Sequence, residues 1–120
     1  MKASKFVSEV KDYLDKNDDL NGEICYPYCD LYGFVGIESL KGQIILIPEE
    51  PETPYYDKFD QFPDSRLNVI DILDLIQKEI DENGDRDLYY ETFDSEKEPV
   101  NHWQTTYRMI VPMYLEDINE

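Results

Sequence analysis

The residues best suited to binding a metal are two cysteines and one histidine. Cys25 and Cys29 are separated by three residues, and His102 is the only histidine in the chain. A structural zinc site needs four ligands, usually two close pairs of Cys or His, and this chain has one such pair. In a strand the two cysteines would point to the same face, as two thiols in a core do. The pattern therefore favours core cysteines and predicts no metal site.

Calcium chemistry is suggested by residues 81–87, where carboxylate and amide oxygens recur at alternate positions. An EF-hand loop requires Gly at its sixth position and Glu at its twelfth. Counted from Asp81, those positions hold Arg86 and Thr92. We therefore expect the end of a helix followed by a solvated turn.

Catalytic signatures are also missing from the sequence. The chain has no Gly-x-Ser-x-Gly elbow and no glycine-rich phosphate loop, and a catalytic triad would have to use His102. General acid–base catalysis needs a carboxyl group with a raised pKa in a dry cleft, which an abundance of Asp and Glu does not supply. We expect a protein that is not an enzyme and binds no cofactor.

The charge of the chain restricts the partners it can bind. It has 28 acidic and 11 basic residues among 120, a formal net charge of -17. Nucleic acids and anionic membranes are disfavoured as direct ligands, because binding to phosphates depends on Lys and Arg. A basic protein is the partner that this charge favours.

The remaining composition indicates one folded domain. Hydrophobic residues make up 41% of the chain, with ten Tyr and five Phe, which is far from the composition of disordered chains. No apolar run reaches the ~20 residues that span a bilayer, and the N-terminal residues lack the apolar stretch of a signal peptide. With only two cysteines, the sequence predicts a cytoplasmic protein.

Hydrophobic periodicity predicts an α+β fold with an antiparallel-rich sheet and two helices, in the order α-β-β-β-α-β-β. The expected elements are a helix at 3–17, strands at 23–28, 31–39 and 43–48, a helix at 66–83, and strands at 87–93 and 102–116. A hairpin is expected at Lys41-Gly42, with a buried central strand after it. Asp64-Ser65 is the expected cap of the second helix and Gly84 its stop.

The second helix has two different faces. Its apolar face comprises Val69, Ile72, Leu73, Ile76 and Ile80. At about 100° per residue, the opposite face carries Asp71, Asp74, Asp81, Glu82 and Asp85. Lys78 interrupts this acidic face and Leu75 lies at its edge.

The acidic face suggests how a basic partner is recognised. Residues 71–98 contain eleven acidic side chains and only three basic ones. Carboxylates on a rigid helix and the segment after it can imitate a phosphate backbone and occupy a basic nucleic-acid channel. The predicted partner-binding residues are Asp71, Asp74, Leu75, Asp81, Glu82, Asp85, Asp87, Glu91, Tyr55 and Tyr56, of which Tyr55, Tyr56 and Leu75 would be apolar anchors.

The first half of the chain resembles small acidic accessory proteins of phages and mobile elements. The resemblance lies in the helix with Phe6-Val7-Ser8-Glu9-Val10, the turn at 17–22, Glu23-Ile24, and a hairpin ending in Ile44-Ile45-Leu46-Ile47. That class includes anti-restriction and anti-CRISPR proteins, several of which imitate DNA. The resemblance implies an inhibitor of a host defence protein.

Two alternatives remain open. The expected strand at 107–115 and the segment Thr53-Pro54-Tyr55-Tyr56-Asp57 resemble phage tail terminator and minor tail proteins. That resemblance implies a virion component that forms a ring of identical subunits. The third alternative is an immunity protein against a nuclease toxin, for which the same negative charge would be suitable.

Overall fold

The structure, a computed structural model, describes residues 1–17, 22–27, 32–49, 67–106 and 109–116. Within these residues the elements run α1 (Ala3–Lys16), β1 (Glu23–Ile24), β2 (Phe34–Leu40), β3 (Gln43–Pro48), α2 (Val69–Asn83), β4 (Asp87–Glu91), β5 (Lys97–Pro99), β6 (His102–Thr106) and β7 (Met109–Met113). The predicted α+β class, the two helices and the order of the elements are confirmed.

A four-stranded sheet has the order β2-β3-β4-β5. β2 and β3 form the predicted hairpin, closed at Lys41 and Gly42, and Gly42 has the positive φ of 82° that a side chain disfavours. β3 lies in the middle of this sheet, and Ile44, Ile45 and Leu46 are fully buried, as expected for a central strand. β4 runs parallel to β3, and α2 connects the two strands.

A second sheet has the order β1-β7-β6 and corrects the prediction for the C-terminal residues. The single strand expected at 102–116 is two antiparallel strands, with Thr105 opposite Ile110. Neither Gly nor Pro marks this reversal in the sequence, so alternation alone could not reveal it. Pro112 lies in the middle strand rather than at an edge. It is tolerated there because β1 pairs only with Met109 and Ile110.

The start of α2 and the segment after β4 also differ from the prediction. α2 begins at Val69, and the side chain of Asn68 accepts a hydrogen bond from the backbone N–H of Asp71 at 2.8 Å. Asn68 is therefore the N-cap, and the expected cap at Asp64-Ser65 is wrong. The helix ends at Gly84, as predicted, with a φ of 90°. β5, at Lys97–Pro99, lies between the expected strands at 87–93 and 102–116, where the sequence predicted no strand.

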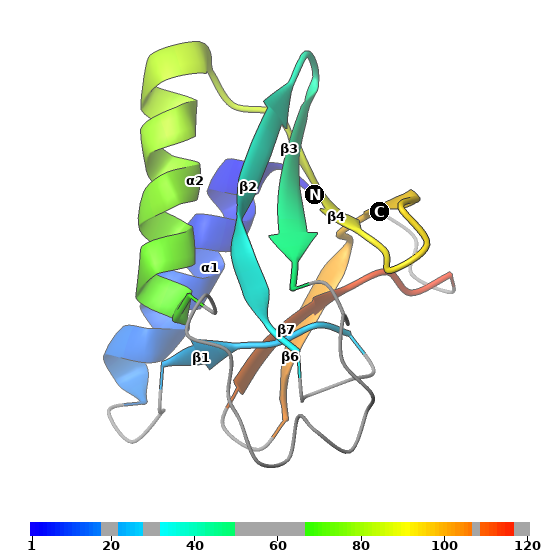
Figure 1. Cartoon of the computed structure of the whole chain (residues 1–120). Helices are drawn as coiled ribbons and strands as arrows, with labels where there is room; N and C mark the ends of the chain where they lie inside the picture. The colour runs from blue at the N-terminus through cyan, green and yellow to red at the C-terminus, as the bar shows by residue number, and fades with distance from the viewer. Residues whose placement is uncertain (18–21, 28–31, 50–66, 107–108, 117–120) are drawn as a thin grey trace.

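Both helices pack on one face of the four-stranded sheet (Figure 1). Their apolar stripes meet the inward side chains of β3 and β4, as the helical periodicity predicted. The core comprises Phe6, Val7 and Val10 of α1, Ile72, Leu73 and Ile76 of α2, and Ile44, Leu46, Leu88 and Tyr90 of the sheet, among others. α2 therefore turns its polar side to the solvent.

A smaller apolar cluster lies around the second sheet. It comprises Cys25 together with Met109, Val111 and Met113 of β7. The expectation that Cys25 is a core thiol is confirmed, since it is only 1% exposed. Cys29, the segment 50–66 with Tyr55 and Tyr56, and the expected cap residues Asp64 and Ser65 lie outside the described residues.

Candidate partner-binding surface

The solvent-facing side of α2 carries four exposed carboxylates, from Asp71, Asp74, Asp81 and Glu82. We call these four residues the α2 acidic face. Their positions on the helix cover a sector of about 100°, because successive residues are about 100° apart. The face results directly from the amphipathic pattern, since burial of the apolar stripe forces the opposite side outward.

Within the described part of the chain, no ion pair neutralises the α2 acidic face. Lys78 lies between Asp74 and Asp81 and is exposed, but it forms no ion pair there. Asp81 accepts a hydrogen bond from the Gln77 amide at 2.9 Å, which leaves its charge in place. A basic partner would therefore meet carboxylates that are not already paired with a cation.

The C-terminal end of α2 is an unfavourable place for two of these acids. Asp81 and Glu82 lie in or near the last turn, where the helix dipole favours cations. No basic residue occupies that turn. Each carboxylate near a helix C-terminus costs about 0.3–1 kcal/mol in exposed positions. Helix stability therefore gives no reason for acids at these positions.

The charge along the α2 acidic face can be compared with that of one DNA strand. Asp71 and Glu82 are eleven positions apart, which corresponds to about 16 Å at ~1.5 Å per residue. One strand of B-DNA has a phosphate every ~3.4 Å, or about five over the same length. Four carboxylates together with Lys78 give a net charge of -3 over this length, against about -5 for one strand.

Two apolar side chains flank the acidic face. Leu75 is 36% exposed, as the sequence suggested, and Ile70 is 48% exposed. At 100° per residue, they lie on opposite sides of the four carboxylates. Ile70 was not among the predicted binding residues. The sequence does indicate its exposure, because at about 100° per residue it lies outside the sector that holds the buried Val69 and Ile72.

Asp85 does not belong to the acidic face, contrary to the prediction. The helix ends before it, and its carboxylate accepts hydrogen bonds from the backbone N–H of Ser4 at 3.1 Å and from the Ser4 hydroxyl at 2.5 Å. Burial acts to raise the pKa of Asp85, but the hydrogen bonds from Ser4 and from the backbone of Arg86, together with the charge of Lys2, outweigh it and hold the pKa below its ordinary value. Asp85 is exposed, but its carboxylate already forms hydrogen bonds within the molecule.

Asp87 and Glu91 lie on β4 and point away from α2. The alternate residues Leu88 and Tyr90 belong to the core, so side chains at odd positions lie on the other face of the sheet. Asp87 is half-exposed, and its Oδ1 lies 3.7 Å from Lys2 Nζ. The predicted set is therefore divided, and α2 retains Asp71, Asp74, Leu75, Asp81 and Glu82. Tyr55 and Tyr56 lie outside the described residues.

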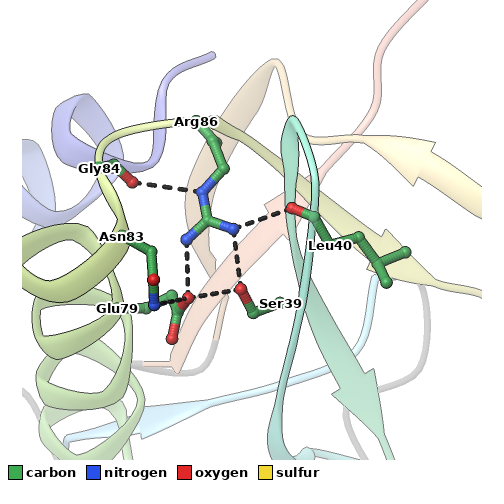
Figure 2. A network of polar contacts seen from close by, with 6 residues as sticks. All are labelled: Ser39, Leu40, Glu79, Asn83, Gly84 and Arg86. Carbon is green, nitrogen blue, oxygen red and sulfur yellow. Dashed lines mark hydrogen bonds and ion pairs between the residues drawn. The ribbon is translucent and has the colours of Figure 1, made fainter.

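An internal network holds the C-terminal end of α2 to the β2–β3 hairpin (Figure 2). Arg86 Nη2 donates to Glu79 Oε1 at 2.9 Å, and its Nη1 donates to Ser39 Oγ at 2.8 Å and to the Leu40 carbonyl at 2.9 Å. Asn83 and Ser39 also donate to the Glu79 carboxylate.

Both charged side chains of this network are largely shielded, with exposures of 13% for Arg86 and 16% for Glu79. The hydrogen bond from Ser39, followed by that from Arg86, holds the pKa of Glu79 below its ordinary value. These contacts could not be predicted from the sequence, because Ser39 is 40 positions away from Glu79 along the chain. The network fixes the helix end that carries Asp81 and Glu82.

The described residues contain no group of three or more His, Cys, Asp or Glu side chains that could hold a metal ion. No helix among these residues has the length and apolar character required to cross a membrane. No protein-family model, curated protein or solved structure matches the chain.

Proposed function

We propose that this chain is a non-enzymatic acidic binding protein that acts in the cytoplasm. It occupies the basic nucleic-acid-binding surface of another protein by imitating the charge of DNA. A phage-encoded inhibitor of a host defence protein would work in this way. The observation that carries the proposal is the α2 acidic face, four exposed carboxylates without a cation partner among the described residues.

The rigidity of α2 supports this function. The helix packs on α1 and β2, and the Arg86–Glu79 network holds its C-terminal end. Its carboxylates are therefore presented at fixed spacing, which lowers the entropy lost on binding. Unpaired surface charge also steers a basic partner and raises the association rate, an effect that weakens with salt. Ile70 and Leu75 add apolar area beside the charges.

The test uses a charge-neutralised α2 variant and a control matched in charge. The test variant carries Asp71→Asn, Asp74→Asn, Asp81→Asn and Glu82→Gln. The control neutralises four exposed acids elsewhere, Asp15, Glu38, Asp94 and Glu116. Both variants remove four negative charges, so a difference between them reports position rather than net charge.

Proteins captured from a host extract by the immobilised wild-type chain are eluted with duplex DNA and identified by mass spectrometry. We expect to find a nucleic-acid-binding protein that duplex DNA displaces from the wild-type chain. The control variant should also retain this protein, and the α2 variant should not. Equal retention by both variants would contradict the proposal. Light scattering of the purified chain adds a separate check, since a ring of identical subunits would instead favour a virion component.

A further inference from the structure

A pocket of about 870 Å³ lies between the start of α1, β4 and the start of β6. This volume is within the range of small-molecule sites. α1 contributes Lys5 and Glu9, β4 contributes Tyr89, and β6 contributes His102 and Trp103. No residue of α2 lines it, so the pocket is distinct from the acidic face.

The two carboxylates that line the pocket already have partners. Glu9 Oε1 accepts a hydrogen bond from Trp103 Nε1 at 3.0 Å. Asp87 Oδ1 lies 3.7 Å from the ammonium group of Lys2. The amide of Asn101, also in the lining, exchanges hydrogen bonds with the backbone of Leu115 at 2.8 and 2.9 Å. One oxygen of each carboxylate, and the amide of Asn101, are therefore already in contact with other groups of the protein.

Three other lining groups are hydrogen-bond donors: the ammonium group of Lys5, the hydroxyl of Tyr89 and the imidazole of His102. Within the part of the chain that the structure describes, none of the three side chains forms a hydrogen bond or an ion pair. Tyr89 and His102 are only half-exposed, so water can reach their polar atoms from fewer directions than on an open surface. All three groups can donate to one ligand, and an oxyanion is the acceptor that an ammonium group prefers.

The walls of the pocket also suit a flat apolar group. Trp103 packs edge-on against Tyr13, with ring centroids 5.6 Å apart, and its Nε1 is held by Glu9. Tyr89 and Pro99 face each other in neighbouring strands and both line the pocket. An indole held at two points offers a rigid surface on which a planar ring can stack.

The net charge of -17 does not prevent an anion from binding here. At physiological salt, exposed charges more than about 8 Å away are largely screened. The charged side chains in the lining are balanced, with Lys2 and Lys5 against Glu9 and Asp87. Glu9 keeps its charge, because its partner is the neutral indole of Trp103, so these four side chains carry no net charge. Lys5 is the cation among them that has no partner in the described chain, which leaves its ammonium group available to an anion.

We propose that this pocket binds a small organic oxyanion, a carboxylate or a phosphate carried by a flat ring. Lys5, Tyr89 and His102 donate to its oxygens, and the ring lies against Trp103. This site goes beyond the proposed recognition of a basic protein and uses different residues.

The test exploits the fact that Trp103 is the only tryptophan of the chain. Its fluorescence is recorded during titration with phenyl phosphate and with benzoate, at physiological salt and neutral pH. Benzyl alcohol supplies the ring without the charge, and inorganic phosphate supplies the charge without the ring. We expect saturable changes with the two ring-bearing anions and weaker binding of both controls. The tighter of the two anions identifies the natural headgroup as phosphate or carboxylate.

Variants connect the signal to the pocket. Lys5→Gln should weaken binding about tenfold, since a charge-assisted hydrogen bond of this kind corresponds to about that factor. Tyr89→Phe should weaken it severalfold. Lys11→Gln, on the same helix but outside the pocket, and the charge-neutralised α2 variant should bind as the wild type does. Absence of a saturable change with both anions, equal binding of benzyl alcohol, or unchanged affinity in Lys5→Gln would overturn the proposal.

Discussion

The hydroxyl of Ser4 donates a hydrogen bond to the carboxylate of Asp85 at 2.5 Å, and the backbone N–H of Ser4 donates to the same carboxylate at 3.1 Å. Lys2, at the N-cap position of α1, provides no side-chain cap. The first turn of a helix leaves backbone N–H groups unsatisfied, and Asp85 supplies the missing acceptor from 81 positions further along the chain. A residue predicted for partner binding therefore joins the end of α2 to the start of α1.

Removing this distant cap should destabilise the fold. We expect Asp85→Ala to lower the free energy of unfolding by about 1 kcal/mol, as loss of a helix cap does. Asp85→Asn should lose less, because an amide oxygen still accepts the hydrogen bonds. Urea denaturation followed by circular dichroism measures the change, and Asp94→Ala, in an exposed turn outside the helices, is the control. If Asp85→Ala and Asp94→Ala unfold at the same urea concentration, the cap does not contribute to stability.

The elements themselves could be predicted because they depend on local periodicity. The apolar stripe around Phe6 and Val10, and the compact run around Ile45, contain enough information to define α1 and β3. The roles of Asp85 and Arg86 could not be predicted, because they depend on Ser4 and Ser39, which only the folded chain brings near. The reversal between β6 and β7 was missed because no turn residue marks it.

Stability should depend on pH through Asp85 and Glu79. Their pKa values are lower in the folded protein than in the unfolded chain, where they are about 4. Each carboxylate therefore stabilises the fold above the unfolded pKa, and this contribution is lost as pH falls through the folded value. Protonation of the surface acids also relieves repulsion, so the comparison must be made between variants.

The measurement is the urea midpoint of the wild type and of Asp85→Asn with Glu79→Gln, at pH values from neutral to about 3. We expect the wild-type advantage at neutral pH to shrink as the pH falls below about 4, where the unfolded chain takes up protons that the folded carboxylates bind only at lower pH. A difference that stays constant across this range would show that neither carboxylate is stabilised by its charge.

Arg86 should be replaceable by neither a neutral residue nor another cation. Its guanidinium group donates at once to Glu79, Ser39 and the Leu40 carbonyl. Lysine keeps the charge but lacks this planar set of donors. We expect Arg86→Gln to lower the Tm by several degrees and Arg86→Lys to restore only part of the loss. Lys78→Gln removes the same charge from an exposed site and should leave the Tm nearly unchanged. If Arg86→Lys has the same Tm as the wild type, the charge of Arg86 alone accounts for its contribution, and its several hydrogen bonds do not.

Removing the charges of Asp81 and Glu82 should have opposite effects on the stability of the protein and on its proposed binding. The helix dipole opposes both carboxylates, so Asp81→Asn with Glu82→Gln should raise the free energy of unfolding by about 0.5–2 kcal/mol in total. If the α2 acidic face binds a basic partner, the same double variant should bind that partner more weakly and with a smaller salt dependence. Differential scanning calorimetry and a salt series of affinities measure the two effects. Greater stability with unchanged affinity would mean that these acids serve solubility alone. Greater stability with weaker binding would show that binding is the reason these acids occupy a destabilising position.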